Sequence, residues 1–226
     1  MTRIGVIFVP PMQLIDVAPV ELFSMMEKAY IQANGLPQDI VDIALPNHSI
    51  KIAFISQLGP DTTAQTIPGL GLAATHTIYD SEVAPGNLDI LLIPGTDPSA
   101  VLDEAILAFV RSHVADGVDL LAICTGVFVA AQAGVLNDRI ATGPRGMLDR
   151  LSRAFPKVKW QDKRYVTDGN IWTCSVITNG MDMTATYISA KWPDLLANTV
   201  ITLADIYIRS AEYEAPRIAF DQMTFL

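Results

Sequence analysis

The residue of this sequence whose type and position most favour a catalytic role is Cys124. An apolar run, Val118–Ile123, leads directly into it, and an Ala-rich helical segment, Thr125–Ala133, leaves it with no loop between them. Such a residue lies at the carboxyl end of a parallel strand, where open α/β sheets place their sites, and at the N-terminus of a helix. Because unpaired helix amides stabilise a thiolate, we expect a Cys124 pKa below the ordinary value of about 8.5. The pattern predicts a cysteine nucleophile elbow, with Gly126 allowing the tight turn and the close approach of another group.

The alternative interpretation of Cys124 is a small buried core residue, which is the commonest fate of a free cysteine. Cys174 follows the apolar Ile171–Thr173 and is interpreted as core packing. The two cysteines are fifty residues apart and the three histidines are scattered, so neither a disulfide framework nor a zinc site is expected. We expect neither a metal nor an organic cofactor.

Two acidic residues could partner the cysteine. Asp16 follows a strand expected at Ile4–Val9, and it is either the N-cap of the next helix or an acid that faces the same edge of the sheet as Cys124. Glu21 is the alternative acid, although the helix dipole alone also favours a carboxylate in a first helical turn. The residues alone leave both acids open.

Gly95 and Thr96 follow the strand expected at Leu88–Ile93, at the same edge of the sheet. An anionic intermediate needs fixed N–H donors, each worth about 2.7–4 kcal/mol in measured enzymes, and backbone amides here could supply them. Thr125 offers a further amide at the helix start and a hydroxyl group. The alternative for Gly95 is an ordinary Pro-Gly turn that ends a strand.

Composition limits the fold and the partners. The chain has 226 residues, of which 50% are hydrophobic and 17% charged, so it can bury a sizeable core and disorder is excluded. No linker interrupts it, which predicts a single domain over residues 1–226, with 211–226 as a polar and aromatic C-terminal tail that packs against a neighbouring subunit. The net charge of −9 disfavours nucleic acid or an anionic membrane as a partner. The N-terminal apolar run is too short to span a membrane, and we expect a cytoplasmic protein.

Apolar runs alternate with helical patterns along the chain, which predicts an α/β fold with a mostly parallel sheet and helices on both faces. Further strands are expected at Ile50–Ser56, Ile140–Thr142, Tyr165–Val166 and Ile171–Cys174. Helices are expected at Val17–Ala33, Glu104–Val114, Met147–Ala154, Asp182–Lys191 and Leu195–Ile208.

Four segments carry a resemblance to a known family. They are RIGVIFVPPMQLIDVAPVELF, DILLIPGTDP, LLAICTGVFVAAQAGVLNDRIATG and DGNIWTCSVITNGMDM, which spread from Arg3 to Met183. Together they resemble the ThiJ/PfpI superfamily, which is glutamine-amidotransferase-like, and within it the isocyanide (isonitrile) hydratase branch and its fungal relatives. The resemblance implies a flavodoxin-like sandwich and a homodimer that acts on a small molecule.

The resemblance also implies roles for single residues. Thr125 stands where protease- and chaperone-like relatives carry a histidine, as in the hydratase branch. In that branch an acid hydrogen-bonds the cysteine, and Asp16 is the matching residue, although the family's Asp-x-x-Gly-Pro is one residue shorter here. Glu21 therefore stays open as the acid. The amides matching Gly95 and Thr96 lie near the cysteine in the family as an oxyanion-type pocket.

The segment Gly143–Pro144–Arg145 departs from the Thr-His-Trp or Ser-His-Trp of bacterial hydratases. Arg145 is either a grip for a substrate carboxylate or phosphate, or an exposed arginine near a helix start. The activity implied is a cysteine-dependent lyase that adds water to an isocyanide and forms an N-formamide. The alternatives are a biosynthetic lyase or cyclase acting on a larger substrate, and an oxidation-sensing stress protein built on Cys124. A regulator is disfavoured, because superfamily transcription factors append a helix-turn-helix domain.

Overall fold

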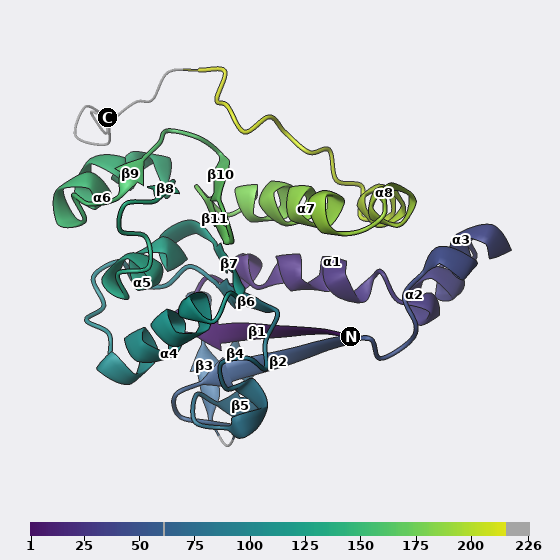
Figure 1. Ribbon diagram of the computed structural model, residues 1–226, viewed down its shortest axis with the longest axis horizontal. Coiled ribbons are helices and arrows are strands. Elements are labelled where there is room, and N and C mark those ends of the chain that lie inside the picture. Colours follow the sequence, from purple (N-terminus) through teal and green to yellow (C-terminus); the bar gives the residue numbers. More distant parts are fainter. Residues whose placement is uncertain (61, 216–226) are drawn as a thin grey trace.

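The computed structural model describes residues 1–60 and 62–215, and a seven-stranded sheet forms its centre (Figure 1). Its strands, in chain order, are β1 (Thr2–Phe8), β2 (Ile50–Ser56), β5 (His76–Thr77), β6 (Ile90–Ile93), β7 (Asp119–Ala122), β10 (Tyr165–Asp168) and β11 (Ile171–Cys174). In space they follow the order β10-β11-β7-β6-β1-β2-β5. Every pair is parallel except β10 with β11, so the carboxyl ends of β11, β7, β6 and β1 lie next to one another.

Helices cover both faces of this sheet. One apolar layer includes side chains of α1 (Glu21–Ser24), α7 (Asn179–Lys191) and α8 (Asp194–Leu203). The other includes side chains of α4 (Glu104–Ala115), α5 (Val127–Gln132) and α6 (Leu148–Ala154). The predicted α/β sandwich with a mostly parallel sheet is confirmed.

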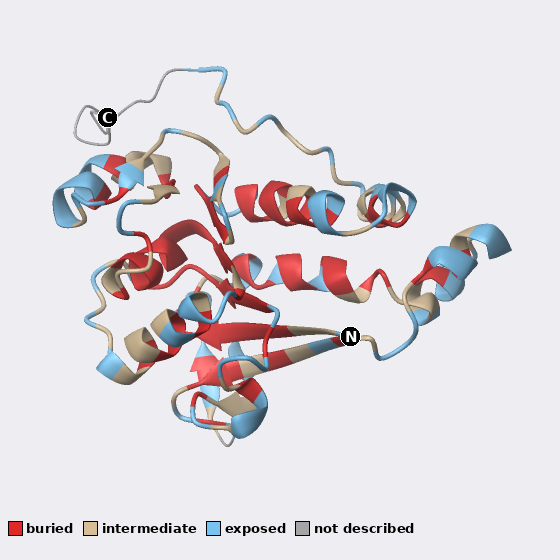
Figure 2. Ribbon diagram, in the orientation of Figure 1, coloured by how far each residue is buried: buried red, intermediate tan, exposed pale blue. Residues whose placement is uncertain are grey.

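The central strands are continuous apolar runs because they have no solvent-facing side. In β6, Ile90 and Leu92 pack into one layer, whereas Leu91 and Ile93 pack into the other. This alternation is the period of two that a strand imposes on its side chains. Figure 2 shows the buried residues following these strands and the inner faces of the helices.

The single helix predicted over residues 17–33 was wrong in its continuity. The structure has two 3₁₀ turns, η1 (Leu14–Asp16) and η2 (Ala18–Val20), then α1, and after a break α2 (Lys28–Ala33). At the break the amide of Lys28 donates to the Leu45 carbonyl at 2.9 Å, and the Leu45 amide donates to the Met26 carbonyl at 2.9 Å. A tertiary backbone pairing has replaced the local helical hydrogen bonds.

Other differences lie in short elements. The helix predicted over residues 195–208 ends at Leu203, and residues 204–215 run without helix or strand. Sequence patterns missed several short elements. Among them are β5, α3 (Gln38–Ile43), which packs on α2, the hairpin β3 (Thr63–Gln65) with β4 (Gly71–Ala73), and β9 (Lys159–Trp160), which pairs with β8 (Ile140–Ala141). The missed strands have two or three residues each and α3 has six, which is too short for an apolar period to be recognised.

The predicted tail, 211–226, is described only to Ala215. Over residues 211–215 it lies along this chain itself, with the Arg164 amide donating to the Ala211 carbonyl at 2.7 Å. Residues 216–226 lie outside the described part. Within the residues described, no helix combines the length and apolar character that crossing a membrane requires.

Candidate active site

Cys124 lies in the short connection between β7 and α5. After Ile123, which is still extended, the cysteine adopts a φ of +53° and opens a 3₁₀ turn, η4 (Cys124–Gly126), that continues into α5. A non-glycine residue in this left-handed region costs roughly 1–3 kcal/mol and persists only where its surroundings impose it. The predicted strand–cysteine–helix corner is confirmed, and it carries the backbone strain of a nucleophile elbow.

Two glycines allow the neighbouring strand ends to meet at this corner. A Cβ on Gly126 would lie 2.3 Å from the Ile93 carbonyl oxygen, so only glycine fits there. A Cβ on Gly95 would lie 2.4 Å from Asp16 Oδ2, 3.0 Å from Thr125 Oγ1 and 3.4 Å from Cys124 Cβ. The ends of β1, β6 and β7 therefore bring Asp16, Gly95, Cys124 and Thr125 to one point.

The Cys124 sulfur is almost fully buried, with 3% of the residue exposed. Backbone N–H groups of Thr125 and Ile177 donate to it, and Gln13 Nε2 donates to it at 3.8 Å. Gln13 and Ile177 come from the loops after β1 and β11, and sequence reasoning missed both. Neither position stands out locally, because an amide becomes a sulfur ligand only through the tertiary fold.

Asp16 lies fully buried in η1, with 0% exposed. Its Oδ2 accepts the Gly95 amide at 3.0 Å, while its Oδ1 has no hydrogen-bond partner among the described residues, the Cys124 sulfur included. The N-cap alternative is not what the structure contains, because neither the Asp16 side chain nor any other caps η2 or α1. Burial raises the pKa of Asp16 to about 6, against the opposing hydrogen bond from Gly95. Such a carboxyl group can accept and return a proton near neutral pH.

The expected low pKa of Cys124 was wrong. Burial of the sulfur, and then the nearby Asp16 charge, raise the pKa of Cys124 to about 11 despite the amides that donate to it. Desolvation of a thiolate is costly in an apolar interior, and α5 has only six residues with which to offset it. At neutral pH the pair therefore consists of a thiol and a carboxylate.

The threonines of the site tie its strands together. Thr125 Oγ1 donates to the Thr96 carbonyl at 2.6 Å, and Thr96 Oγ1 donates to the Val9 carbonyl at 2.6 Å. Both threonines are buried. These bonds fix the loops after β7, β6 and β1 relative to one another. The amide of Gly95 is engaged by Asp16, and that of Thr125 by the sulfur.

Glu21 and Arg145 lie apart from the sulfur. Glu21 is exposed and lines an apolar groove of about 850 Å³ between η1, η2 and β4, of which Cys124 is not a lining residue. The Arg145 guanidinium binds both carboxylate oxygens of Asp162, at 2.8 and 3.0 Å, and lies 4.0 Å from the centre of the Tyr213 ring. In the described residues no three His, Cys, Asp or Glu side chains are grouped to hold a metal ion.

The fold and this corner define an α/β protein with a cysteine nucleophile elbow. The profile of the DJ-1/PfpI family matches residues 25–190, and the chain belongs to that family. The match includes Cys124, Gly95 and Arg145, whereas Asp16 and Glu21 precede it.

The similar proteins include both a named enzyme and a named transcriptional regulator. The chain is 32% identical over 152 residues to the isonitrile hydratase of Pseudomonas putida, covering 66% of this chain and 62% of that protein. It is 28% identical over 168 residues to the HTH-type transcriptional regulator GbdR of Pseudomonas aeruginosa strain UCBPP-PA14, covering 66% of this chain and 46% of that protein. The chain thus spans less than two thirds of each relative. The crystal structure of a ThiJ/PfpI family protein from Pseudomonas syringae superposes with a TM-score of 0.71 at 20% identity, over 95% of this chain and 78% of that one.

Proposed function

We propose that this protein is a cysteine-dependent lyase that adds water to an isocyanide and releases an N-formamide. The observation that carries the proposal is a strained, buried cysteine beside a buried carboxylate whose Oδ1 has no partner. A buried polar atom without a partner costs free energy unless something else, such as a reacting proton, uses it. The 32% identity to isonitrile hydratase supports the choice of substrate class.

The first step joins the Cys124 sulfur to the terminal carbon of R–N≡C. As the S–C bond forms, Asp16 takes the thiol proton and delivers it to the same carbon, which gives the thioimidate R–N=CH–S–Cys124. A carboxyl pKa near 6 suits this transfer, because Asp16 begins ionised and returns the proton in the same step. The amides of Thr125 and Ile177 stabilise the negative charge that develops on the sulfur.

The second step consumes water. Water adds to the thioimidate carbon, and one of its protons passes through Asp16 to the nitrogen. The C–S bond then breaks while the remaining hydroxyl proton passes through Asp16 to the sulfur, which releases R–NH–CHO and the free thiol. The overall balance is R–NC plus H₂O to R–NH–CHO. Asp16 again serves as acceptor and donor, so one buried carboxylate suffices for both steps.

The test uses purified protein, a panel of alkyl and aryl isocyanides, and NMR detection of the formyl proton. We expect turnover by the wild-type chain and a loss of at least about 1000-fold in Cys124→Ala, because the covalent step disappears. Cys174→Ala is the matched control, since Cys174 is also buried and accepts the Cys124 amide, whereas the proposed steps do not use its thiol. Undiminished turnover by folded Cys124→Ala would overturn the mechanism, and no turnover of any isocyanide would overturn the substrate class.

Two observations weigh against the alternative functions. Oxidation sensing needs an accessible thiolate, whereas Cys124 is 3% exposed and its pKa is raised. A larger substrate gripped by Arg145 would have to displace the bidentate Asp162.

The proposal retains a single domain, a homodimer, a cytoplasmic location and no nucleic-acid partner. The net charge of −9 supports the last of these. Light scattering of the purified chain tests the homodimer, which a monomeric mass would contradict.

A further inference from the structure

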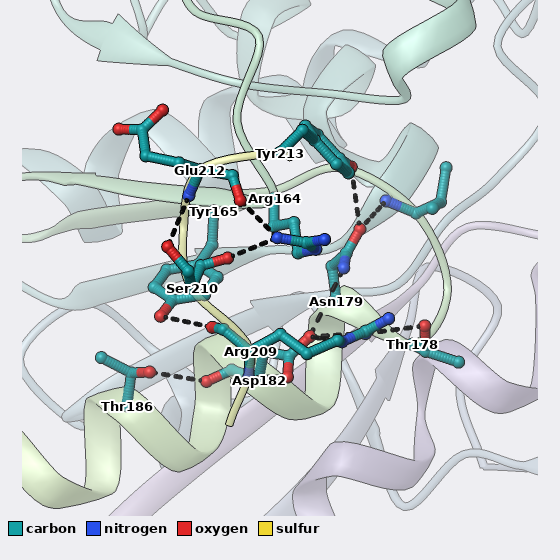
Figure 3. Close-up of polar contacts among 11 residues, drawn as sticks. Arg164, Tyr165, Thr178, Asn179, Asp182, Thr186, Arg209, Ser210, Glu212 and Tyr213 are labelled. Atoms are coloured by element: carbon teal, nitrogen blue, oxygen red, sulfur yellow. Dashed lines mark hydrogen bonds and ion pairs between the residues drawn. The ribbon is translucent and has the colours of Figure 1, made fainter. Parts of the chain in front are cut away.

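The described chain after α8, residues 204–215, crosses the molecule as a segment without helix or strand. We call residues 204–215 the strap; in Figure 1 it leaves α8 and passes above α7 toward β10. Figure 3 shows strap residues Arg209, Ser210, Glu212 and Tyr213 among side chains of α7 and β10. Ala204, Ile206 and Ile208 pack its first part against the apolar layer of α7 and α8, and from Arg209 onward its contacts are charged and aromatic.

The first contact of the strap is an ion pair with a buried acid. Asp182, in the first turn of α7, is 2% exposed. Its Oδ1 accepts the Arg209 amide at 3.0 Å, and its Oδ2 accepts Arg209 Nε at 3.0 Å and Nη2 at 2.5 Å. Nη2 also donates to Thr178 Oγ1 at 2.9 Å. One arginine thereby joins the strap to α7 and to the turn before it.

The second contact is made by Tyr213. Its hydroxyl donates to Asn179 Oδ1 at 3.2 Å, and the same oxygen accepts the Val176 amide at 3.1 Å. The Tyr213 ring lies 4.0 Å from the Arg145 guanidinium carbon and 4.7 Å from that of Arg164, both cation–π distances.

Both contacts end on residues 175–179, which connect β11 to α7. Val176, Ile177 and Thr178 are exposed between the buried Ser175 and Asn179, and within the turn the Asn179 amide donates to the Val176 carbonyl at 2.6 Å. On one side this turn bonds the strap through Thr178 and Asn179, and on the other the Ile177 amide donates to the Cys124 sulfur. The strap and the sulfur therefore contact the same turn.

We propose that the strap positions the Ile177 amide against the Cys124 sulfur, with Arg209 and Tyr213 as its positioning residues. Without these two residues the turn would lose the side-chain contacts that Thr178 and Asn179 make with the strap, and the Ile177 amide would be held less firmly against the sulfur. The consequence for catalysis rests on the proposed function, but the consequence for the Ile177 amide does not.

The test compares full-length Arg209→Ala, Arg209→Lys and Tyr213→Phe with wild type by amide hydrogen exchange and by isocyanide kinetics. In Arg209→Ala we expect exchange at Ile177 to rise at least about tenfold more than at the buried amides of β6 and β7, because local opening precedes global unfolding. We expect kcat to fall about tenfold with KM nearly unchanged. Arg209→Lys should recover part of both effects, because lysine keeps the charge without the planar fork, and Tyr213→Phe should be about two- to fivefold affected.

The matched control is Arg139→Ala, which removes a similarly half-exposed arginine from its ion pair with Asp168, away from the turn. It should leave Ile177 exchange and kcat at wild-type values. The proposal is overturned if Ile177 exchange in Arg209→Ala rises only as much as that of β6 and β7. Should Arg209→Ala not fold, unchanged Ile177 exchange in Tyr213→Phe overturns it. Altered exchange in a chain that turns over no isocyanide would leave the strap proposal standing and remove the proposed function.

Discussion

Two carboxylates in this molecule are almost equally buried, but in the part of the chain that the structure describes only one of them is paired with a cation. Asp182 is 2% exposed and receives three hydrogen bonds from Arg209, which neutralise it. Asp16 is 0% exposed, receives one backbone hydrogen bond, and has no cation bound to it among the described residues. Burying a charge is costly unless it is paired, so the ion pair offsets the cost of burying Asp182, whereas no cation of the residues described offsets the cost of burying an ionised Asp16. A protein keeps such an unpaired carboxylate where its chemistry uses the proton.

The largest expected loss of stability follows from breaking the buried ion pair between Asp182 and Arg209. Arg209→Ala removes the cation that pairs with Asp182 and leaves a buried carboxylate unpaired, and we expect a loss of about 3–5 kcal/mol in the free energy of unfolding. Urea denaturation followed by circular dichroism measures it. Glu104→Ala, which removes an exposed ion pair with Arg111, is the control and should cost less than about 1 kcal/mol. Equal costs for both variants would mean that burial does not distinguish these pairs.

The next largest effect is the pH dependence of stability that the unpaired Asp16 causes. The pKa of Asp16 is about 6 in the fold against an ordinary 3.8, so its ionisation opposes folding. Its contribution to stability is complete below pH 3.8 and is lost as the pH rises through 6, which at about 1.4 kcal/mol per pKa unit amounts to about 3 kcal/mol.

Asp16→Asn keeps an acceptor for the Gly95 amide but cannot ionise. Relative to wild type we expect it to gain up to about 3 kcal/mol between pH 3 and pH 8 and to lose at least about 100-fold in activity. Parallel denaturation curves across that range measure the gain. A difference in unfolding free energy that does not change with pH would show that Asp16 does not titrate as described.

A smaller effect is expected from a substitution that displaces the Asp16 carboxylate without removing it. Gly95→Ala places a methyl group 2.4 Å from Asp16 Oδ2, so the carboxylate must shift. We expect a cost of about 2 kcal/mol in stability and a fall of about 100-fold in kcat, since small displacements of a reacting group are expensive. Thermal unfolding and kinetics on one preparation test this, and wild-type kcat would contradict the placement of Asp16 in the reaction.

The smallest effect is expected at Thr125. Thr125→Val removes the hydroxyl that donates to the Thr96 carbonyl, which should cost about 1 kcal/mol and only a few-fold in activity. Both are measured with the same assays. A loss above about 100-fold at unchanged stability would instead give the hydroxyl a direct role on the substrate.

Local hydrophobic patterns predicted most of the central sheet and its helices, and also the strand–cysteine–helix turn of the site. The run into Cys124 predicted β7, the turn and α5 because burial on both faces leaves a continuous apolar signature. The break at Glu27 was missed, since its cause is the distant Leu45. Gln13 and Ile177 were missed for the same reason, as each reaches the sulfur from another strand end.

By itself the sequence determined which segments become strands and helices and that Cys124 lies at the end of one strand and the start of a helix. Only the tertiary structure decided the protonation of the site. The pKa values of Cys124 and Asp16 are raised because loops separated by tens of residues close over them and exclude water. Desolvation is a property of the whole surrounding volume, and no local spacing of residues records it.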